Sequence, residues 1–277
     1  MRTATAALSI VVGAALWFVP ASASAAGCKR GSEGFERAQF GVDLGLSLGG
    51  GATAAVGRFA ILQRRGRDWD LAIDRGVPEN GSEASRIASD VLLWSSFAGA
   101  AAWGIYATVH CNRRYTLRRT VATPLLEVVW PFLWTYGLGE ITKSFSGRPR
   151  PYTRGEEGFM DERDDYRSFW SGHTANSATM VSVTVGSALR FAKGRAGTRG
   201  GRALISAGSG LVYGLTTGVT RVVAARHHWS DILVGGFIGT GIGLLPIATE
   251  AIGRHGEGEI AIGPWLGGAG GQVGGRF

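Results

Sequence analysis

Long stretches without charged residues alternate with short charged connections along this chain. Three of them, at 91–109, 203–219 and 232–249, run 17 to 19 residues without Asp, Glu, Lys or Arg. A helix needs about 20 apolar residues to cross the hydrocarbon core of a bilayer. The three stretches therefore predict helices of nearly membrane-spanning length.

Three further stretches are less uniform. Segment 121–141 is apolar but contains two glutamates and two prolines, segment 174–189 is uncharged but rich in Ser, Thr and Ala, and segment 41–57 is rich in Gly and carries Asp43. Together the six stretches predict an all-α fold, a helical bundle of about five to six helices that we expect to be transmembrane. The mean hydropathy of +0.09 is low for six true spans, so a water-soluble helical bundle is the competing interpretation.

Composition narrows the class of protein. Apolar residues make up 45% of the 277 residues and charged residues only 18%, which excludes a disordered chain. The 45 glycines are typical of helices whose backbones approach closely. A net charge of +8 could indicate a nucleic-acid partner, but basic and aromatic residues form no common stripe, and we expect no nucleic acid to bind.

The first 26 residues have the pattern of a secretory signal peptide. Arg2 precedes an apolar run at 4–20, and 21–26 consists of Ala and Ser. We expect export, with the active site outside the cytoplasm. Cys28 follows the signal, but the large aliphatic residue of a lipoprotein signal is missing, so we expect Cys28 and Cys111 to be free thiols.

The charges of two connections predict the topology. Segments 111–120 and 193–202 each hold four Lys or Arg residues and no acid, which is typical of cytoplasmic loops. The intervening connections then face the periplasm of a bacterial inner membrane. We divide the chain into the signal peptide, an extracytoplasmic or interfacial segment at 27–84, a helical domain at 85–252 and a Gly-rich tail at 253–277.

Three short clusters carry the candidate chemistry. They read K-x6-R-P, S-G-H and R-x5-H-x3-D, and they comprise Lys143, Arg150 and Pro151, then Ser171, Gly172 and His173, then Arg221, His227 and Asp231. Three cations, two histidines and a carboxylate are the groups needed to cleave a phosphate ester without a metal.

The spacing of the third cluster indicates a nucleophile. His227 and Asp231 are four residues apart and would share one face of a helix. A carboxylate bonded to one ring nitrogen fixes the tautomer and leaves the other nitrogen free to attack. We therefore predict His227 as the nucleophile, forming a phosphohistidine, and Asp231 as the group that orients it. The neighbouring His228 would point about 100° away around a helix and is predicted to take no part.

The second cluster precedes segment 174–189 and should form the N-terminus of that helix. Free backbone N–H groups and the positive end of the helix dipole suit a phosphate there. Gly172 permits close approach, the Ser171 hydroxyl can donate to a phosphate oxygen, and His173 can protonate the leaving group. Ser and Gly are also ordinary capping residues, so His173 is what distinguishes the cluster.

Cations from the first and third clusters would clamp the phosphate. Lys143 and Arg221 are candidates, together with Arg148 or Arg150, between which the residues alone do not choose. Because these cations already supply the positive charge, we expect neither a metal nor a cofactor. An acidic stretch at 156–165 could bind a divalent cation, but a solvated loop is the simpler interpretation.

The clusters resemble those of the type 2 phosphatidic acid phosphatase family, which shares its site with vanadium haloperoxidases and bacterial class A acid phosphatases. The resemblance covers about 85–252 and implies a helical bundle. Its spacing selects Arg150 over Arg148, and it implies phosphate binding by Lys143, Arg150, Ser171, Gly172 and Arg221, with His173 as acid, His227 as nucleophile and Asp231 as its partner. Trp170 and Thr220 stand where the family usually has Pro and Ser, and Trp170 is placed to shape the pocket mouth.

The sequence therefore predicts a metal-independent phosphatase that hydrolyses a lipid phosphate or polyprenyl pyrophosphate on the extracytoplasmic side, with the substrate and the membrane as its partners. A soluble periplasmic non-specific acid phosphatase is the alternative enzyme. A non-catalytic phospholipid-binding membrane protein is the alternative from a different class. The oligomeric state is not fixed by the sequence.

Overall fold

The structure, a computed structural model, describes residues 33–60, 71–111, 123–154, 163–191 and 194–255. Within these ranges the chain forms helices and connections and no β-strand. The predicted signal peptide, Cys28, most of the basic connection at 111–120, most of the acidic stretch and nearly all of the C-terminal tail lie outside the described residues.

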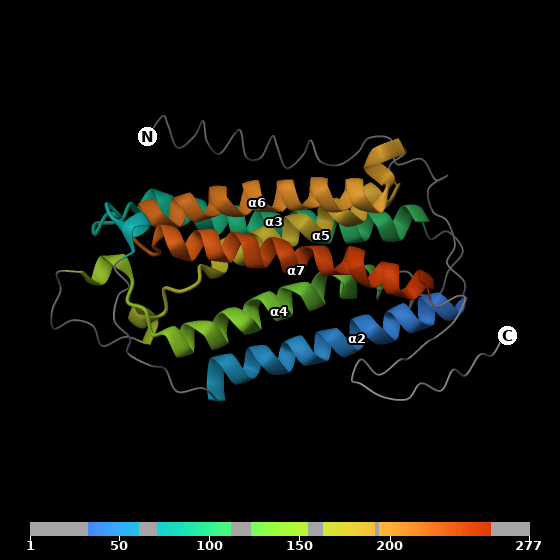
Figure 1. Cartoon of the computed structure of the whole chain (residues 1–277), viewed down its shortest axis with the longest axis horizontal. Helices are drawn as coiled ribbons and strands as arrows, with labels where there is room; N and C mark the ends of the chain where they lie inside the picture. Colours follow the sequence, from blue (N-terminus) through green and yellow to red (C-terminus); the bar gives the residue numbers. More distant parts are fainter. Residues whose placement is uncertain (1–32, 61–70, 112–122, 155–162, 192–193, 256–277) are drawn as a thin grey trace, which may run out of the picture.

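Long helices running along a common axis form the described part of the chain (Figure 1). They are α2 (Glu33–Ala55), α3 (Glu83–Cys111), α4 (Thr123–Ser146), α5 (Gly172–Ala188), α6 (Arg199–Val223) and α7 (Trp229–His255). The all-α bundle predicted from the charge-free stretches is confirmed. Helices α3, α6 and α7 extend beyond their charge-free stretches at both ends, because polar residues occupy the helix ends.

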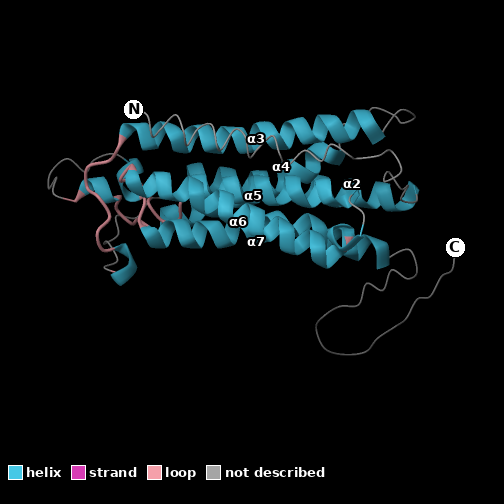
Figure 2. Ribbon diagram, turned by 90° about the horizontal axis from the view of Figure 1, so that it is seen from above, coloured by secondary structure: helices cyan, strands magenta, loops and turns pink. Residues whose placement is uncertain are grey.

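Helix α5 lies at the centre of the bundle, in contact with α3, α4, α6 and α7 (Figure 2). Its residues from Thr174 to Met180 are all buried, although few of them are large. Small side chains at these positions allow the surrounding helices to approach the backbone of α5. The Ser, Thr and Ala content of segment 174–189 therefore reflects a central position.

Glycines on α6 and α7 complete this close packing. A Cβ atom added at Gly239 of α7 would lie 2.1 Å from the carbonyl oxygen of Ala175, and one added at Gly214 of α6 would lie 2.7 Å from Cβ of Ala178. Both glycines belong to rows spaced four residues apart, which place one glycine per turn on the face that meets α5. The rows are 210, 214 and 218 on α6, and 235, 239 and 243 on α7.

Helices α2 and α4 pack side by side along the edge of the bundle (Figure 1). The indole N–H of Trp134 donates to the carbonyl of Leu46 at 2.9 Å, and a Cβ atom at Gly137 would lie 2.7 Å from the backbone nitrogen of Ala54. Residues 33–55 thus pack against the helical domain. The division of the chain at 84 stays a prediction.

The two glutamates of α4 are paired with arginines. Glu127 accepts from Arg190 at 3.1 and 3.3 Å. Glu140 is buried and accepts from the buried Arg167. Charged side chains inside a packed helical domain need such partners, since burying an isolated charge is costly. The glutamates therefore do not interrupt the helix that the apolar pattern predicts.

One described helical stretch is long and apolar enough to cross a membrane, namely Trp229–Thr249 of α7. Half of its most apolar window is buried inside the bundle. The buried interior of a soluble bundle can produce the same pattern, so the prediction of several spans is supported only weakly.

Candidate active site

The three sequence clusters meet at one end of the bundle, where α4 and α6 end and α5 and α7 begin (Figure 1). Lys143 lies in the last turn of α4, and a Cβ atom added at Gly172 would be 3.1 Å from its Nζ atom. The N–H of Ser171 donates to the carbonyl of Asp231 at 3.2 Å, which joins the start of α5 to the start of α7. Segments far apart in the sequence thus form a single site.

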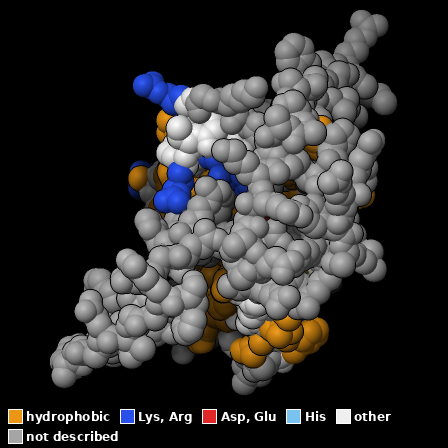
Figure 3. Space-filling model, turned by 90° about the vertical axis from the view of Figure 1, so that its right-hand side faces the viewer, with side chains coloured by type: hydrophobic (Ala, Val, Ile, Leu, Met, Phe, Trp, Pro, Cys, Tyr) orange, Lys and Arg blue, Asp and Glu red, His pale blue; other side chains and the backbone are white. Residues whose placement is uncertain are grey.

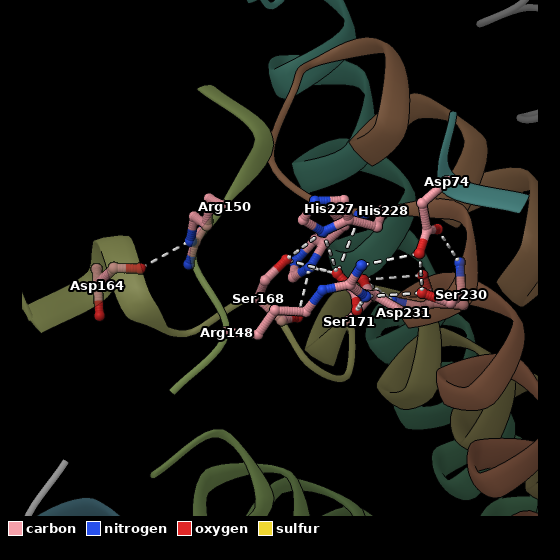
Figure 4. A network of polar contacts seen from close by, with 11 residues as sticks. Asp74, Arg148, Arg150, Asp164, Ser168, Ser171, His227, His228, Ser230 and Asp231 are labelled. Carbon is pink, nitrogen blue, oxygen red and sulfur yellow. Dashed lines mark hydrogen bonds and ion pairs between the residues drawn. The ribbon is translucent and has the colours of Figure 1, made fainter. Parts of the chain in front are cut away.

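His227 lies in the connection between α6 and α7 and is buried. Its Nδ1 atom is 2.8 Å from the carbonyl oxygen of Ser168 (Figure 4). A carbonyl can only accept, so Nδ1 carries the proton and Nε2 keeps its lone pair. Burial lowers the pKa of His227 well below 6.5, and the nearby Arg221 and Arg150 lower it further. The ring is therefore neutral at physiological pH, with Nε2 able to act as a nucleophile.

The predicted partner of His227 makes a weaker contact than expected. Oδ2 of Asp231 is 3.6 Å from Nδ1 of His227, so the Ser168 carbonyl is the nearer acceptor. The same oxygen accepts from the Ser168 hydroxyl and from the N–H of His228 at 2.9 Å. Asp231 thus fixes the loop that carries His227 as much as it fixes the ring.

His228 departs from the prediction. It is fully buried, and its Nδ1 atom lies 3.3 Å from both the Ser168 hydroxyl and Oδ2 of Asp231. His227 and His228 both lie in the connection before α7 and not in a helix. The predicted angle of about 100° between their side chains, which assumed a helix, therefore does not apply. His228 belongs to the polar network behind the site.

Arg148 is the centre of this network, which Figure 4 shows from close by. Its guanidinium donates to Oδ1 of Asp231 at 2.7 Å, to Ser230 at 2.7 Å and to Oδ2 of Asp74 at 2.8 Å. Asp74 also accepts from the N–H and the hydroxyl of Ser230, both at 2.8 Å. Because Arg148 has no exposed surface and binds two carboxylates, it is a structural residue.

Of the two arginines, Arg148 and Arg150, Arg150 therefore remains the candidate for binding phosphate. Its backbone N–H and Nε atom bond to the carbonyls of Asp165 and Asp164, both at 2.8 Å. Burial lowers the pKa of Arg150 below the usual range of an arginine. Its charge contributes to lowering the pKa values of Lys143, Arg221 and His227, so these groups share one electrostatic environment.

Lys143 and Arg221 are largely buried cations with few acidic neighbours, namely Glu140 for Lys143 and Asp90 for Arg221. Burial lowers the pKa of Lys143 to about 8, and Glu140, 3.4 Å away, opposes this shift. Burial also lowers the pKa of Arg221 to about 9, and the charge of Arg150 adds to the effect. Within the described residues, Nε of Arg221 is buried and has no hydrogen-bond partner. A concentration of positive charge with spare donors is suited to an anion.

The start of α5 faces this charge. Ser171 is the N-cap residue, and its hydroxyl oxygen accepts from the backbone and hydroxyl of Thr174, at 3.4 and 2.9 Å. Its hydroxyl hydrogen is not used in these bonds and can point to a ligand. Gly172 and His173 follow as the first helical residues, where backbone N–H groups have no intrahelical acceptor. The prediction of a helix N-terminus at this cluster is confirmed.

His173 lies between positive groups and one carboxylate. Its Nε2 atom is 2.8 Å from Oδ1 of Asp90 on α3. Burial lowers its pKa to about 4, Arg221 and Lys143 act in the same direction, and Asp90 opposes them. In the free protein His173 is therefore neutral at pH 7. An anion bound beside Arg221 would favour the protonated ring.

The structure thus brings all eight predicted site residues to one end of the bundle and adds others. Asp74, Asp90 and Ser168 were missed by sequence analysis. Asp90 directly precedes the charge-free stretch 91–109, which is the only signal that pointed to it. Trp170 is buried, with its indole nitrogen 3.2 Å from a Cβ atom placed at Gly139, so it packs against α4. Its role in shaping the pocket mouth stays a prediction.

A comparison with protein-family models found a match to the PAP2 superfamily over residues 124–250. Searches of curated proteins and of solved structures found no match. The matched region runs from the start of α4 into the last turns of α7 and contains all eight predicted site residues. Residues 124–250, somewhat less than half of the chain, are therefore similar to the PAP2 superfamily.

Proposed function

We propose that this protein is a metal-independent phosphatase that hydrolyses a lipid phosphate or polyprenyl pyrophosphate through a phosphohistidine intermediate. The match of residues 124–250 to the PAP2 superfamily supports phosphoester hydrolysis in general. The observation that carries the proposal is the state of His227. Its Nδ1 atom is held by the Ser168 carbonyl, so Nε2 is free beside Arg150 and Arg221.

In the first step, Nε2 of His227 attacks phosphorus while the bond to the leaving oxygen breaks. Lys143, Arg150 and Arg221 stabilise the charge on the equatorial oxygens. The N-terminus of α5 adds backbone N–H donors on the same side. His173, protonated when the phosphate is bound, gives its proton to the leaving oxygen. The N–P bond replaces the O–P bond, and the alcohol of a lipid phosphate, or the prenyl phosphate of a pyrophosphate, departs.

In the second step, water hydrolyses the phosphohistidine. His173, now neutral, accepts a proton from the water, whose oxygen forms the new bond to phosphorus as the N–P bond breaks. His227 returns to its starting state, with Nδ1 still bonded to the Ser168 carbonyl. Asp231 stabilises the positive charge that the ring carries in the intermediate, from 3.6 Å.

Exposed apolar side chains support action at a membrane. Large side chains on α3, α6 and α7 point outward with more than 60% of their surface exposed, namely Trp94, Ile105, Leu204, Val212 and Phe237. Single exposed apolar residues are ordinary, but their recurrence along three helices of one bundle suits a lipid environment. The candidate span in α7 agrees with this arrangement.

The basic connection supports an orientation. Residues 194–198 lie at the end of the bundle opposite the site (Figure 1), and Lys and Arg side chains are visible on that end in Figure 3. Arg195 and Arg199 are exposed there. Under the positive-inside tendency that end faces the cytoplasm, and the site faces the periplasm of a bacterial inner membrane.

A soluble periplasmic acid phosphatase is the second candidate, favoured by the presence of only one candidate span among the described residues. Extraction separates the two. A membrane enzyme requires detergent to be released from the cells, whereas release by osmotic shock alone would refute the membrane proposal. A preference of the purified protein for small aryl phosphates over lipid phosphates would point the same way.

The decisive experiment measures phosphate release from phosphatidate, polyprenyl pyrophosphate and 4-nitrophenyl phosphate by the wild type, with EDTA present. We expect activity to persist in EDTA, and its loss would overturn the metal-independent mechanism. His227→Ala should lower kcat by at least about a thousandfold, since the chemical step loses its nucleophile. His255→Ala, at the far end of α7, is the matched control and should retain activity.

Trapping tests the intermediate directly. Wild-type protein quenched during turnover of a labelled substrate should carry acid-labile, base-stable phosphate on His227. Full activity of His227→Ala, or label on another residue, would show that the nucleophile is wrongly assigned. A protein with no hydrolytic activity on any phosphate ester, which nevertheless binds phosphatidate vesicles, would instead be a phospholipid-binding module.

A further inference from the structure

Helix α3 lies outside the region matched by the family model, yet it contributes polar groups to the site. Oδ1 of Asp90 is 2.8 Å from Nε2 of His173 and 3.8 Å from Nη1 of Arg221. The adjacent Ser89 accepts from Nη1 of Arg221 at 3.1 Å. Two consecutive residues of α3 therefore contact the candidate general acid and one of the phosphate-binding cations.

We propose that Asp90 is a positioning residue for the general acid, holding the His173 ring through Nε2 so that Nδ1 delivers the proton to the leaving group. This inference rests on the proposed phosphatase function. A hydrogen bond from Nε2–H to a carboxylate fixes both the tautomer and the orientation of an imidazole. The proton to be transferred is then carried by Nδ1.

The charges around His173 explain why such a partner is needed. The charges of Arg221 on α6 and Lys143 on α4 both oppose protonation of the ring. Asp90 on α3 is the acidic group among the described residues that acts on His173 in the opposite direction. Arg86, one turn earlier on α3, lies 3.5 Å from the other oxygen of Asp90 and leaves Oδ1 to the histidine.

The proton balance of the step is simple. Nδ1–H of the imidazolium breaks as the leaving oxygen gains the proton, and the P–O ester bond breaks as Nε2 of His227 bonds to phosphorus. The Nε2–H bond of His173 to Asp90 persists throughout. His173 ends the step neutral, in the tautomer that can accept a proton from water in the second step.

A competing role for Asp90 would be to hold Arg221. The geometry favours the histidine, because 2.8 Å is a hydrogen bond whereas 3.8 Å to Nη1 is a longer ionic contact. The two roles make different predictions. Loss of a general acid is felt most with a poor leaving group, whereas loss of an arginine weakens phosphate binding for every substrate.

The experiment compares Asp90→Asn with the wild type on two esters, phenyl phosphate and 4-nitrophenyl phosphate, of which the second has the better leaving group. We expect kcat on phenyl phosphate to fall about tenfold to a hundredfold, a part of what general acid catalysis contributes, and kcat on 4-nitrophenyl phosphate to fall about threefold or less. The basic limb of the kcat/KM profile should move to lower pH. Glu83 lies two turns earlier on α3 and is exposed. The control variant Glu83→Gln should change neither the kcat values nor the pH profile.

Further measurements keep the result interpretable. The double variant His173→Ala with Asp90→Asn should be no slower than His173→Ala alone, and the inhibition constant of inorganic phosphate should not rise in Asp90→Asn. Equal losses of kcat on both esters, or a raised inhibition constant of phosphate, would show that Asp90 serves to hold Arg221. Either result would overturn the proposal. If the wild type is active and His227→Ala is not, the proposed phosphatase function holds. Unchanged kcat values and an unchanged pH profile of Asp90→Asn would then refute the role of Asp90 alone.

Discussion

Arg148 offers the sharpest test of the structure, because its guanidinium is fully buried between two carboxylates. It bonds to Asp74 at 2.8 Å and to Asp231 at 2.7 Å, with Ser230 as a third partner at 2.7 Å. The change to make is Arg148→Met, which keeps most of the side-chain volume and removes the charge. It leaves two carboxylates facing one another without their shared cation.

The expected loss of stability is large. Removing one partner of a buried ion pair costs about 3–5 kcal/mol, because an uncompensated charge remains in the interior. Arg148→Met should therefore lower the free energy of unfolding by about that amount, and the melting temperature by on the order of 10 °C. Adding Asp74→Asn should restore part of the loss, since one of the two unpaired carboxylates is then neutral.

Urea unfolding followed by tryptophan fluorescence, with detergent if extraction requires it, measures the difference between variants. Arg195→Met is the matched control, because Arg195 is exposed at the opposite end of the bundle, and it should change stability by less than about 0.5 kcal/mol. A loss of less than about 1 kcal/mol in the free energy of unfolding of Arg148→Met would contradict the buried network. So would a double variant with Asp74→Asn that is less stable than Arg148→Met alone.

Three further predictions concern packing, pH and phosphate binding. Gly239→Ala should lower stability by about 1–3 kcal/mol because its Cβ would meet the Ala175 carbonyl, whereas Gly241→Ala, with nothing within 4 Å, should be neutral or stabilising in the same unfolding assay. The pKa of His173 is lowered from 6.5 to about 4. The contribution of the neutral ring to the free energy of unfolding is therefore present above pH 6.5 and is lost as the pH falls toward 4. A His173→Gln variant whose melting temperature declines equally over this pH range would contradict the prediction. Arg150→Ala should raise the inhibition constant of inorganic phosphate about tenfold to a hundredfold, as expected for a lost charge-assisted hydrogen bond of about 1.5–3 kcal/mol, and an unchanged constant would remove Arg150 from the site.

Much of the fold could be predicted from the sequence because helix formation is local. Charge-free stretches with helical length marked α3, α6 and α7, and the small residues of 174–189 matched the buried α5. The pattern could not separate lipid-facing from protein-facing surfaces, since both are apolar. Among the described residues, one stretch is long and apolar enough to span a membrane. A Cβ atom added at any glycine of the two rows would lie 1.9–2.9 Å from its nearest neighbour, so much of the small-residue content serves helix packing.

The candidate site divides in the same way. Motif spacing within the chain was enough to select His227, His173, Asp231, Lys143 and Arg221, because each cluster is a short run of residues at helix ends and the connections beside them. The choice of Arg150 over Arg148 needed the family resemblance. Asp74 and Asp90 come from segments outside the motifs, and Ser168 acts on His227 through a backbone carbonyl that any residue possesses. No local pattern can mark such groups, since their roles depend on which helix ends meet in space. The sequence by itself predicted the reaction class and the motif residues. The packing of α3, α4 and α7 decided which arginine is buried, which carbonyl holds His227 and which carboxylate faces His173.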